Sequence, residues 1–367
     1  MNHEQKKILT DILHRYGVFK KIASTLALVC LALLKAGTPS IRGLADYLPL
    51  PYSKQVKTNR IWRFFNKAKT FKPIVVMKAL FCIVFKLADK PFIIIDFTSL
   101  NGFKIKLFIA SLPVNGRSLP FYCRPLYLKD IHNLRYNSEN EFIMITIKEL
   151  LSIIPANLRE RVIILGDRQF GTKRFIQFFR EERVRFIVRI KKKFLVRVGG
   201  TALNSGEIEK GKYVVEIEGK KYFLYVRRDR KEKLILVSNF EDSNSLKAAC
   251  KYLKRSYCEQ MHRDLKNRLN LLFFNSKYYK QLDEEKLRRY SVVFMLTEII
   301  GIWIGKLTKR SKHYFRFCSK KDEKSLFHLG QIVVRQMYEF LEDIGLRFKI
   351  SAVKLFSLNR KLSCDYR

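Results

Sequence analysis

The hydrophobic pattern of this 367-residue chain changes near Lys90, and that change limits the possible folds more than any other feature. Residues 1–88 have helical spacing, with a capping Ser40 before one predicted helix. From residue 91 the pattern is that of strands, because a continuous apolar run is followed by strict alternation. The order predicts a helical N-terminal region followed by a mixed α/β core.

Two Asn-Gly pairs, at 101–102 and 115–116, separate the first three predicted strands and favour tight hairpins. The predicted strands are 91–100, 103–112, 118–128, 161–167 and 184–190, and the predicted helices are 138–154, which Ser138 and Glu141 cap, and 171–183. The resulting order is βββαβαβ. The stretch 191–243 alternates glycines with β-rich runs and is interpreted as a small β insertion.

These patterns divide the chain into four predicted parts. The predicted boundaries are 1–88 for a helical region that binds DNA ends, 89–190 with 244–285 for the catalytic core, 191–243 for the β-rich insertion, and 286–367 for a helical region that could dimerise.

Charge indicates the partner. The chain has 73 Lys and Arg against 33 Asp and Glu, a net charge of +40. A body this positive favours nucleic acid first and an anionic membrane surface second. The apolar runs at 27–35 and 74–88 are too short or too interrupted to span a bilayer, so no membrane partner is expected. The seven cysteines are scattered without a CxxC pair, as in a reduced cytoplasmic protein.

Three acids are candidates for chemistry. Asp96 and Asp167 each end an apolar run, and Glu259 lies in a predicted helix over 251–269. Each alone is more often a cap or a turn former. Together they offer three hard oxygen ligands, which suit Mg²⁺ or Mn²⁺, with two ions acting on a phosphodiester. His262 is interpreted as a phosphate or water contact and not as a ligand.

Basic residues surround Glu259 in the predicted helix. At about 100° per residue, Tyr252, Arg255, Arg263 and Lys266 share its face. Such a face could bind DNA phosphates beside a metal, or it could be a surface helix with favourable ion pairs. Arg60 and Arg63, at helical spacing in 58–69, favour a DNA-contacting module or an ordinary helical bundle about equally.

The spacing Tyr252-x2-Arg255-x3-Glu259-x6-Lys266 resembles the YREK signature of DDE transposases of the bacterial insertion sequence 4 family. "IIIDFTSL" resembles the strand that carries the first Asp of that family, and "LGDRQFGTKRFIQFFREERVRFIVRIK" its second Asp block. "SLPVNGRSLPFY" resembles the segment between them, and the likeness covers roughly residues 36 to 310.

The resemblance implies a ribonuclease-H-like core with a β-rich insertion. It implies a metal-binding triad of Asp96, Asp167 and Glu259, and contacts from Tyr252, Arg255 and Lys266 to the phosphates of transposon ends. It implies cut-and-paste transposition at terminal inverted repeats by a homodimer on double-stranded DNA, in the bacterial cytoplasm near the nucleoid. Two alternatives are a non-catalytic regulator that binds DNA and a stand-alone nuclease with the same core.

Overall fold

The computed structural model describes residues 3–67, 69–88, 90–100, 105–132, 135–229, 232–275, 283–310 and 325–336. The first predicted hairpin turn, at 101–102, lies outside these ranges. The N-terminal helices are α1 (His3–Arg15), α2 (Lys20–Ala36), α3 (Ile41–Tyr47), α4 (Lys54–Asn66) and α5 (Pro73–Leu87). The C-terminal helices are α12 (Glu284–Lys309) and α13 (Leu326–Gln336).

One ten-stranded sheet runs through the molecule in the order β3-β2-β1-β4-β5-β10-β9-β8-β6-β7. Its strands are β1 (Phe92–Leu100), β2 (Ile105–Val114), β3 (Arg117–Tyr127), β4 (Ile163–Gly166), β5 (Arg185–Arg189), β6 (Leu195–Val198), β7 (Thr201–Asn204), β8 (Gly211–Ile217), β9 (Lys220–Asp229) and β10 (Glu232–Ser238). The intervening helices are α6 (Leu128–His132), α7 (Glu139–Ile153), α8 (Ala156–Arg159), α9 (Lys173–Glu181), α10 (Ser245–Leu253) and α11 (Tyr257–Arg263).

The predicted order βββαβαβ is confirmed. β1, β2 and β3 form an antiparallel meander, while β1, β4 and β5 are parallel neighbours. At the described hairpin, Asn115 and Gly116 both have positive φ, as a type I′ turn requires. Ser138 caps α7 as predicted, because its hydroxyl accepts a hydrogen bond from the Glu141 N–H. The Glu141 carboxylate accepts from the N–H of Asn137, one residue before the Ser138 N–H that a capping box uses.

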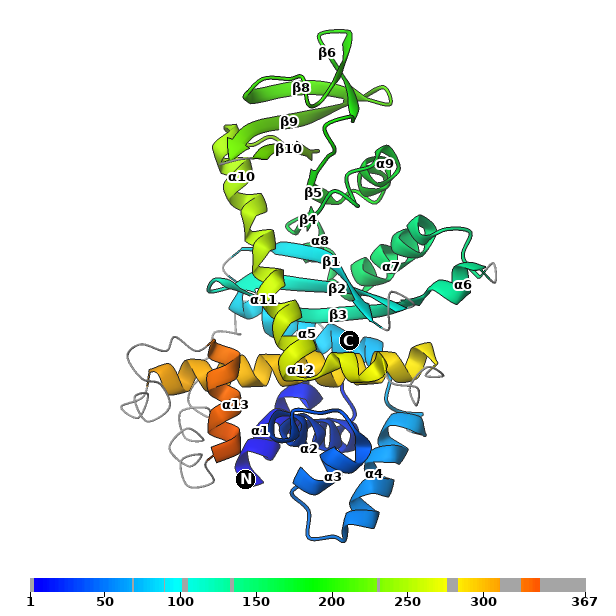
Figure 1. Cartoon of the computed structure of the whole chain (residues 1–367), viewed down its shortest axis with the longest axis vertical. Coiled ribbons are helices and arrows are strands. Elements are labelled where there is room, and N and C mark those ends of the chain that lie inside the picture. The colour runs from blue at the N-terminus through cyan, green and yellow to red at the C-terminus, as the bar shows by residue number, and fades with distance from the viewer. Residues whose placement is uncertain are drawn as a thin grey trace.

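The stretch 191–243 forms strands that continue the core sheet. β10 pairs antiparallel with β5, and β9 and β8 follow outward from it (Figure 1). The chain therefore leaves the core at β5 and returns beside it at β10. The division of the chain into four parts stays a prediction.

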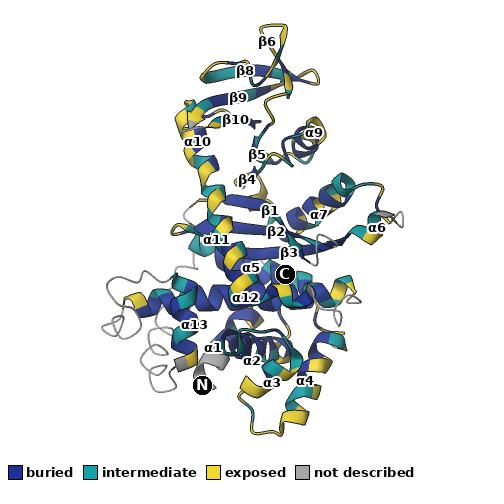
Figure 2. Cartoon of the chain, viewed as in Figure 1, coloured by how far each residue is buried: buried dark blue, intermediate teal, exposed yellow. Residues whose placement is uncertain are grey.

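Helices α1 to α4 gather on one side of α12, while the sheet lies on the other side with α5 packed against β3 (Figure 1). α12 packs against β3, α2 and α13, so it joins the two halves of the core. β1 to β3 and α12 are largely buried, whereas the outer faces of α3, α4 and α10 are exposed (Figure 2).

Among the described residues, α12 is the helix that is long and apolar enough to cross a membrane alone, and α2 with α3 would pass the same test as a bent pair. The apolar stretch of α12 is 83% buried inside the fold, as in the core helix of a globular protein.

Candidate functional site

The two predicted aspartates lie next to each other because their strands are parallel neighbours. The last registered pair between β1 and β4 is Ile94 with Leu165. Extending that register by two residues places Asp96 opposite Asp167. Asp167 follows the end of β4 as expected, but Asp96 lies inside β1, which continues to Leu100 because β2 pairs with it that far. The predicted strand 91–100 is therefore confirmed, and Asp96 ends its apolar run without ending the strand.

Arg255 bridges the two carboxylates. Its Nη2 lies 3.4 Å from Asp96 Oδ2 and 3.7 Å from Asp167 Oδ2. The remaining oxygens are held by the backbone: Asp96 Oδ1 accepts from the Phe97 N–H and Asp167 Oδ1 from the Gln169 N–H, each at 2.9 Å. A single positive charge therefore offsets one of the two negative charges of the pair, at the point where strands β1 and β4 part.

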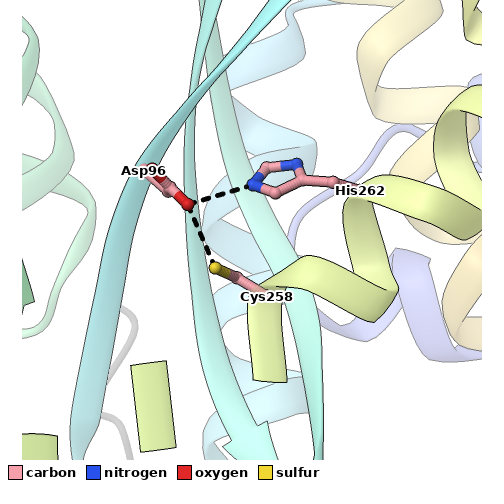
Figure 3. Close-up of side chains that lie close together, drawn as sticks. All are labelled: Asp96, Cys258 and His262. Carbon is pink, nitrogen blue, oxygen red and sulfur yellow. Dashed lines mark hydrogen bonds and ion pairs between the residues drawn. The ribbon is translucent and has the colours of Figure 1, made fainter. Parts of the chain in front are cut away.

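Asp96 has two further partners from α11 (Figure 3). Its Oδ2 lies 3.1 Å from Cys258 Sγ and 3.4 Å from His262 Nε2. Burial in itself raises the pKa of Asp96, but the hydrogen bond with His262, the charge of Arg255 and the Cys258 thiol together lower it below its usual value. The carboxylate is therefore ionised and prepared to hold a cation.

Tyr252 is buried close to this cluster, with an exposed fraction of 6%. Burial raises its pKa to about 12, while the charges of Arg255 and Arg189 act in the opposite direction. The side chain is therefore a neutral phenol. A contact between this phenol and DNA would require it to become accessible.

The segment 251–269 differs from the predicted regular helix. A 3₁₀ turn, Lys254–Ser256, separates α10 from α11, and a π-helical turn, Asp264–Arg268, follows α11. The fully buried Asp264 explains the wide turn, because it is anchored by Arg117 Nη1 and Arg268 Nε, both at 3.0 Å, and by Gln260 Nε2 at 3.1 Å. The prediction of one regular helix over 251–269 was therefore wrong.

The remaining residues predicted around Glu259 lie outside the Asp96 cluster. Glu259 and Arg263 are exposed, with Arg263 Nη1 3.4 Å from Gln260 Oε1, and Lys266 is half-buried on the π-helical turn. Among the described residues, the three metal-ligating side chains that converge are Asp96, Cys258 and His262, and not Glu259. The structure thus brings together Asp96, Asp167, Arg255, His262 and Tyr252.

Arg60 and Arg63 lie on α4, in the N-terminal helical region. They line a cavity of about 790 Å³ between α2 and α4, together with Lys21, Tyr52, Asn59 and Lys67. This hollow is basic and open to solvent, and it belongs to a part of the fold separate from the two aspartates (Figure 1).

A divalent metal fits part of this site. Asp96 and Asp167 supply hard carboxylate oxygens whose side chains are 16% and 33% exposed, within reach of an ion from solvent. Arg255 would have to leave them, and Glu259 would join them only if α11 turned toward β1. Cys258 was missed as a partner of Asp96, although its i, i+4 spacing to His262 on a helix was a usable signal.

Residues 135–296 match the family model of the transposase DDE domain. The match includes Asp167, the π-helical turn and the start of α12, while Asp96 precedes it. No curated protein matches the chain. The match to the DDE domain favours transposase activity and DNA as the partner.

Proposed function

We propose that the chain is a metal-dependent transposase that cuts DNA at terminal inverted repeats and joins the freed ends to a target. The observation that carries the proposal is the pairing of Asp96 with Asp167 at the parting of two parallel strands, inside a chain that matches the DDE domain. Asp96, Asp167 and Glu259 are the proposed catalytic residues. Mg²⁺ or Mn²⁺, as one or two ions, would supply activation of the attacking oxygen when bound.

Arg255 has a defined part in this proposal. Its guanidinium contacts both aspartates, at 3.4 Å and 3.7 Å, and offsets part of their negative charge. A DNA phosphate would draw Arg255 away, because a bidentate guanidinium–phosphate contact matches the geometry of both groups. The departure would free both carboxylates at the moment when substrate arrives. Arg263 and Lys266 would hold neighbouring phosphates.

Glu259 requires a movement of its helix. It is exposed on α11, one residue past Cys258, which contacts Asp96. A rotation of α11 by up to one residue step, about 100°, would bring Glu259 to the place that Cys258 now occupies and turn its carboxylate toward the aspartates. The 3₁₀ turn before α11 and the π-helical turn after it are irregular elements that can absorb such a rotation.

The cut-and-paste course, the homodimeric synaptic complex and the nucleoid location belong to the same proposal. Arg60 and Arg63 are proposed to contact the DNA ends through the basic cavity between α2 and α4. The net charge of +40 supports a large contact with a polyanion.

The test uses purified protein, Mg²⁺ and a plasmid that carries the inverted repeats flanking the gene. Asp96→Asn, Asp167→Asn and Glu259→Gln are compared with Glu160→Gln, an exposed acid before β4, at the end of that strand opposite Asp167. We expect breaks at the repeat tips that fall by at least about 100-fold in the first three variants and persist in the control.

Two results would contradict the proposed activity, and a third would contradict the role of Glu259. Binding without breaks in any protein indicates a regulator that only binds DNA. Scattered breaks unrelated to the repeats indicate a stand-alone nuclease. Breaks that survive Glu259→Gln while Asp96→Asn removes them would leave a two-aspartate site and would refute the role of Glu259.

A further inference from the structure

Three different metal-ligating atoms converge at one point of the structure. Asp96 Oδ2, Cys258 Sγ and His262 Nε2 all lie within 4.8 Å of one another (Figure 3). Cys258 and His262 are one helical turn apart on α11, so a single helix face presents both to β1. The helix and the strand therefore hold the set together without a loop.

Two of the three ligand-to-ligand distances match a tetrahedral metal centre, and the third, from Cys258 Sγ to His262 Nε2, is at most 4.8 Å. Zn–S bonds of about 2.3 Å and Zn–N or Zn–O bonds of about 2.0–2.1 Å give ligand-to-ligand edges of roughly 3.3–3.6 Å. The Asp96 oxygen lies 3.1 Å from the Cys258 sulfur and 3.4 Å from the His262 nitrogen. An ion could enter once the Cys258 sulfur and the His262 nitrogen approach each other to the tetrahedral edge length.

We propose that Asp96, Cys258 and His262 form a site for a thiophilic divalent ion such as Zn²⁺, with a solvent molecule or a phosphate oxygen as fourth ligand. A set of sulfur, imidazole nitrogen and one carboxylate selects Zn²⁺ or Co²⁺ and disfavours Mg²⁺, which takes oxygen ligands. Cys258 binds as thiolate, so each bound ion releases one proton to solvent.

The site has an inhibitory consequence, which rests on the proposed function. Asp96 is shared between this set and the proposed Mg²⁺ site, so a thiophilic ion withholds from the hard ion one of its carboxylates. It also fixes α11 by Cys258 and His262, in the orientation that leaves Glu259 exposed. Bound zinc therefore inhibits DNA cleavage.

The affinity is expected to be moderate. His262 Nδ1 is buried and has no hydrogen-bond partner within the described part of the chain. Imidazole ligands that lack such an outer contact typically bind metal about 10–100-fold more weakly. The positive charge of Arg255 beside Asp96 acts in the same direction. The site therefore responds to changes in free zinc and does not hold the ion permanently.

The first experiment titrates the full-length protein with Co²⁺ and records the absorption spectrum. We expect a thiolate-to-cobalt charge-transfer band that Cys258→Ser removes and that Cys250→Ser, a change at an exposed thiol of α10, leaves intact. His262→Gln is the second variant, checked for folding by circular dichroism, and it should weaken Co²⁺ binding at least 10-fold. A band that survives Cys258→Ser would overturn the proposal.

The second experiment measures DNA cleavage in Mg²⁺ with and without Zn²⁺. Adding Zn²⁺ should lower the cleavage rate at least 10-fold in the Cys250→Ser protein and less than 2-fold in the Cys258→Ser protein. Equal reductions in the two proteins would overturn the inhibitory role. The cobalt spectrum requires no DNA, so a chain that binds cobalt as described but cuts no DNA would refute the proposed function and leave the metal site standing.

Discussion

Glu298 is a fully buried acid on α12, and neither of its carboxyl oxygens has a hydrogen-bond partner among the described residues. Burial raises its pKa well above the usual value, and the negative charge of Asp264 adds to this, while Arg117 acts against it. A carboxyl in this position keeps its proton when the protein is folded and loses it when the chain unfolds at neutral pH.

Glu298→Gln should therefore stabilise the protein at neutral pH and above. The pKa of Glu298 is higher in the folded protein than the value of about 4.3 in the unfolded chain. The wild-type protein therefore keeps its full stability below about pH 4.3, and above it the free energy of unfolding falls by up to about 1.4 kcal/mol per pH unit. We expect the variant to melt several degrees higher at pH 8 and at nearly the same temperature at pH 4. Glu160→Gln, at an exposed position, should show no such pH-dependent gain.

The contribution of Asp96 to stability depends on pH in the opposite direction to that of Glu298. Its pKa is lowered, so its contacts contribute stability above the unfolded value of about 3.9 and lose it as pH falls through the folded value. Asp96→Asn should lower the free energy of unfolding by about 1–3 kcal/mol at pH 7, and the difference should shrink below pH 4. Urea unfolding at a series of pH values measures this. A difference that grows in acid would contradict the assignment.

Helices α12 and α13 cross closely enough that glycine is required. A Cβ at Gly305 would overlap the carbonyl oxygen of Leu326, and one at Gly330 would overlap that of Gly301. At Gly301 the obstacles are side chains and not backbone: the Phe327 ring at 2.7 Å and the Leu34 Cδ2 at 3.1 Å. The backbones themselves therefore fix the contact between these helices.

Gly305→Ala should destabilise the protein by about 1–3 kcal/mol or more, because the clash is with backbone. Gly301→Ala on the same helix is the matched control and should cost less. Thermal melting ranks the two, and hydrogen exchange should show α13 losing protection first in Gly305→Ala. Equal costs would contradict the backbone crossing.

Local sequence signals predicted the elements that depend on neighbours along the chain. The predictions of the Ser138 cap and of the Asn115-Gly116 turn were correct, because a cap and a type I′ turn are determined within about four residues. The segment 251–269 did not follow a regular helix, because Asp264 is tied to Arg117 on β3, a partner far away in sequence. The placement of Asp96 beside Asp167 was predictable from strand order. The orientation of α11, which turns Cys258 and not Glu259 toward Asp96, depends on tertiary packing.

For the whole molecule, the excess of positive charge should dominate DNA affinity. If six to ten phosphates are contacted, binding should weaken by about 10³–10⁵ between 50 and 200 mM salt. Arg60→Ala and Arg63→Ala should each reduce the salt slope by about one. Lys54→Ala on the same helix is the control, because Lys54 already pairs with Asp46 at 2.6 Å. Unchanged slopes in the arginine variants would refute the proposed contact.

Because the chain returns to β5 at β10, the stretch from β6 to β9 is a self-contained insertion, the outer lobe. Ile190 N–H donates to the carbonyl of Ile235 at 3.0 Å, and Arg189 is registered with Leu236. The two ends of the excursion are therefore so close that a short turn could join β5 directly to β10 as a hairpin. Evolution could thus lengthen, trim or exchange this outer lobe without moving Asp96 or Asp167, and an engineer could graft a different module at the same two points.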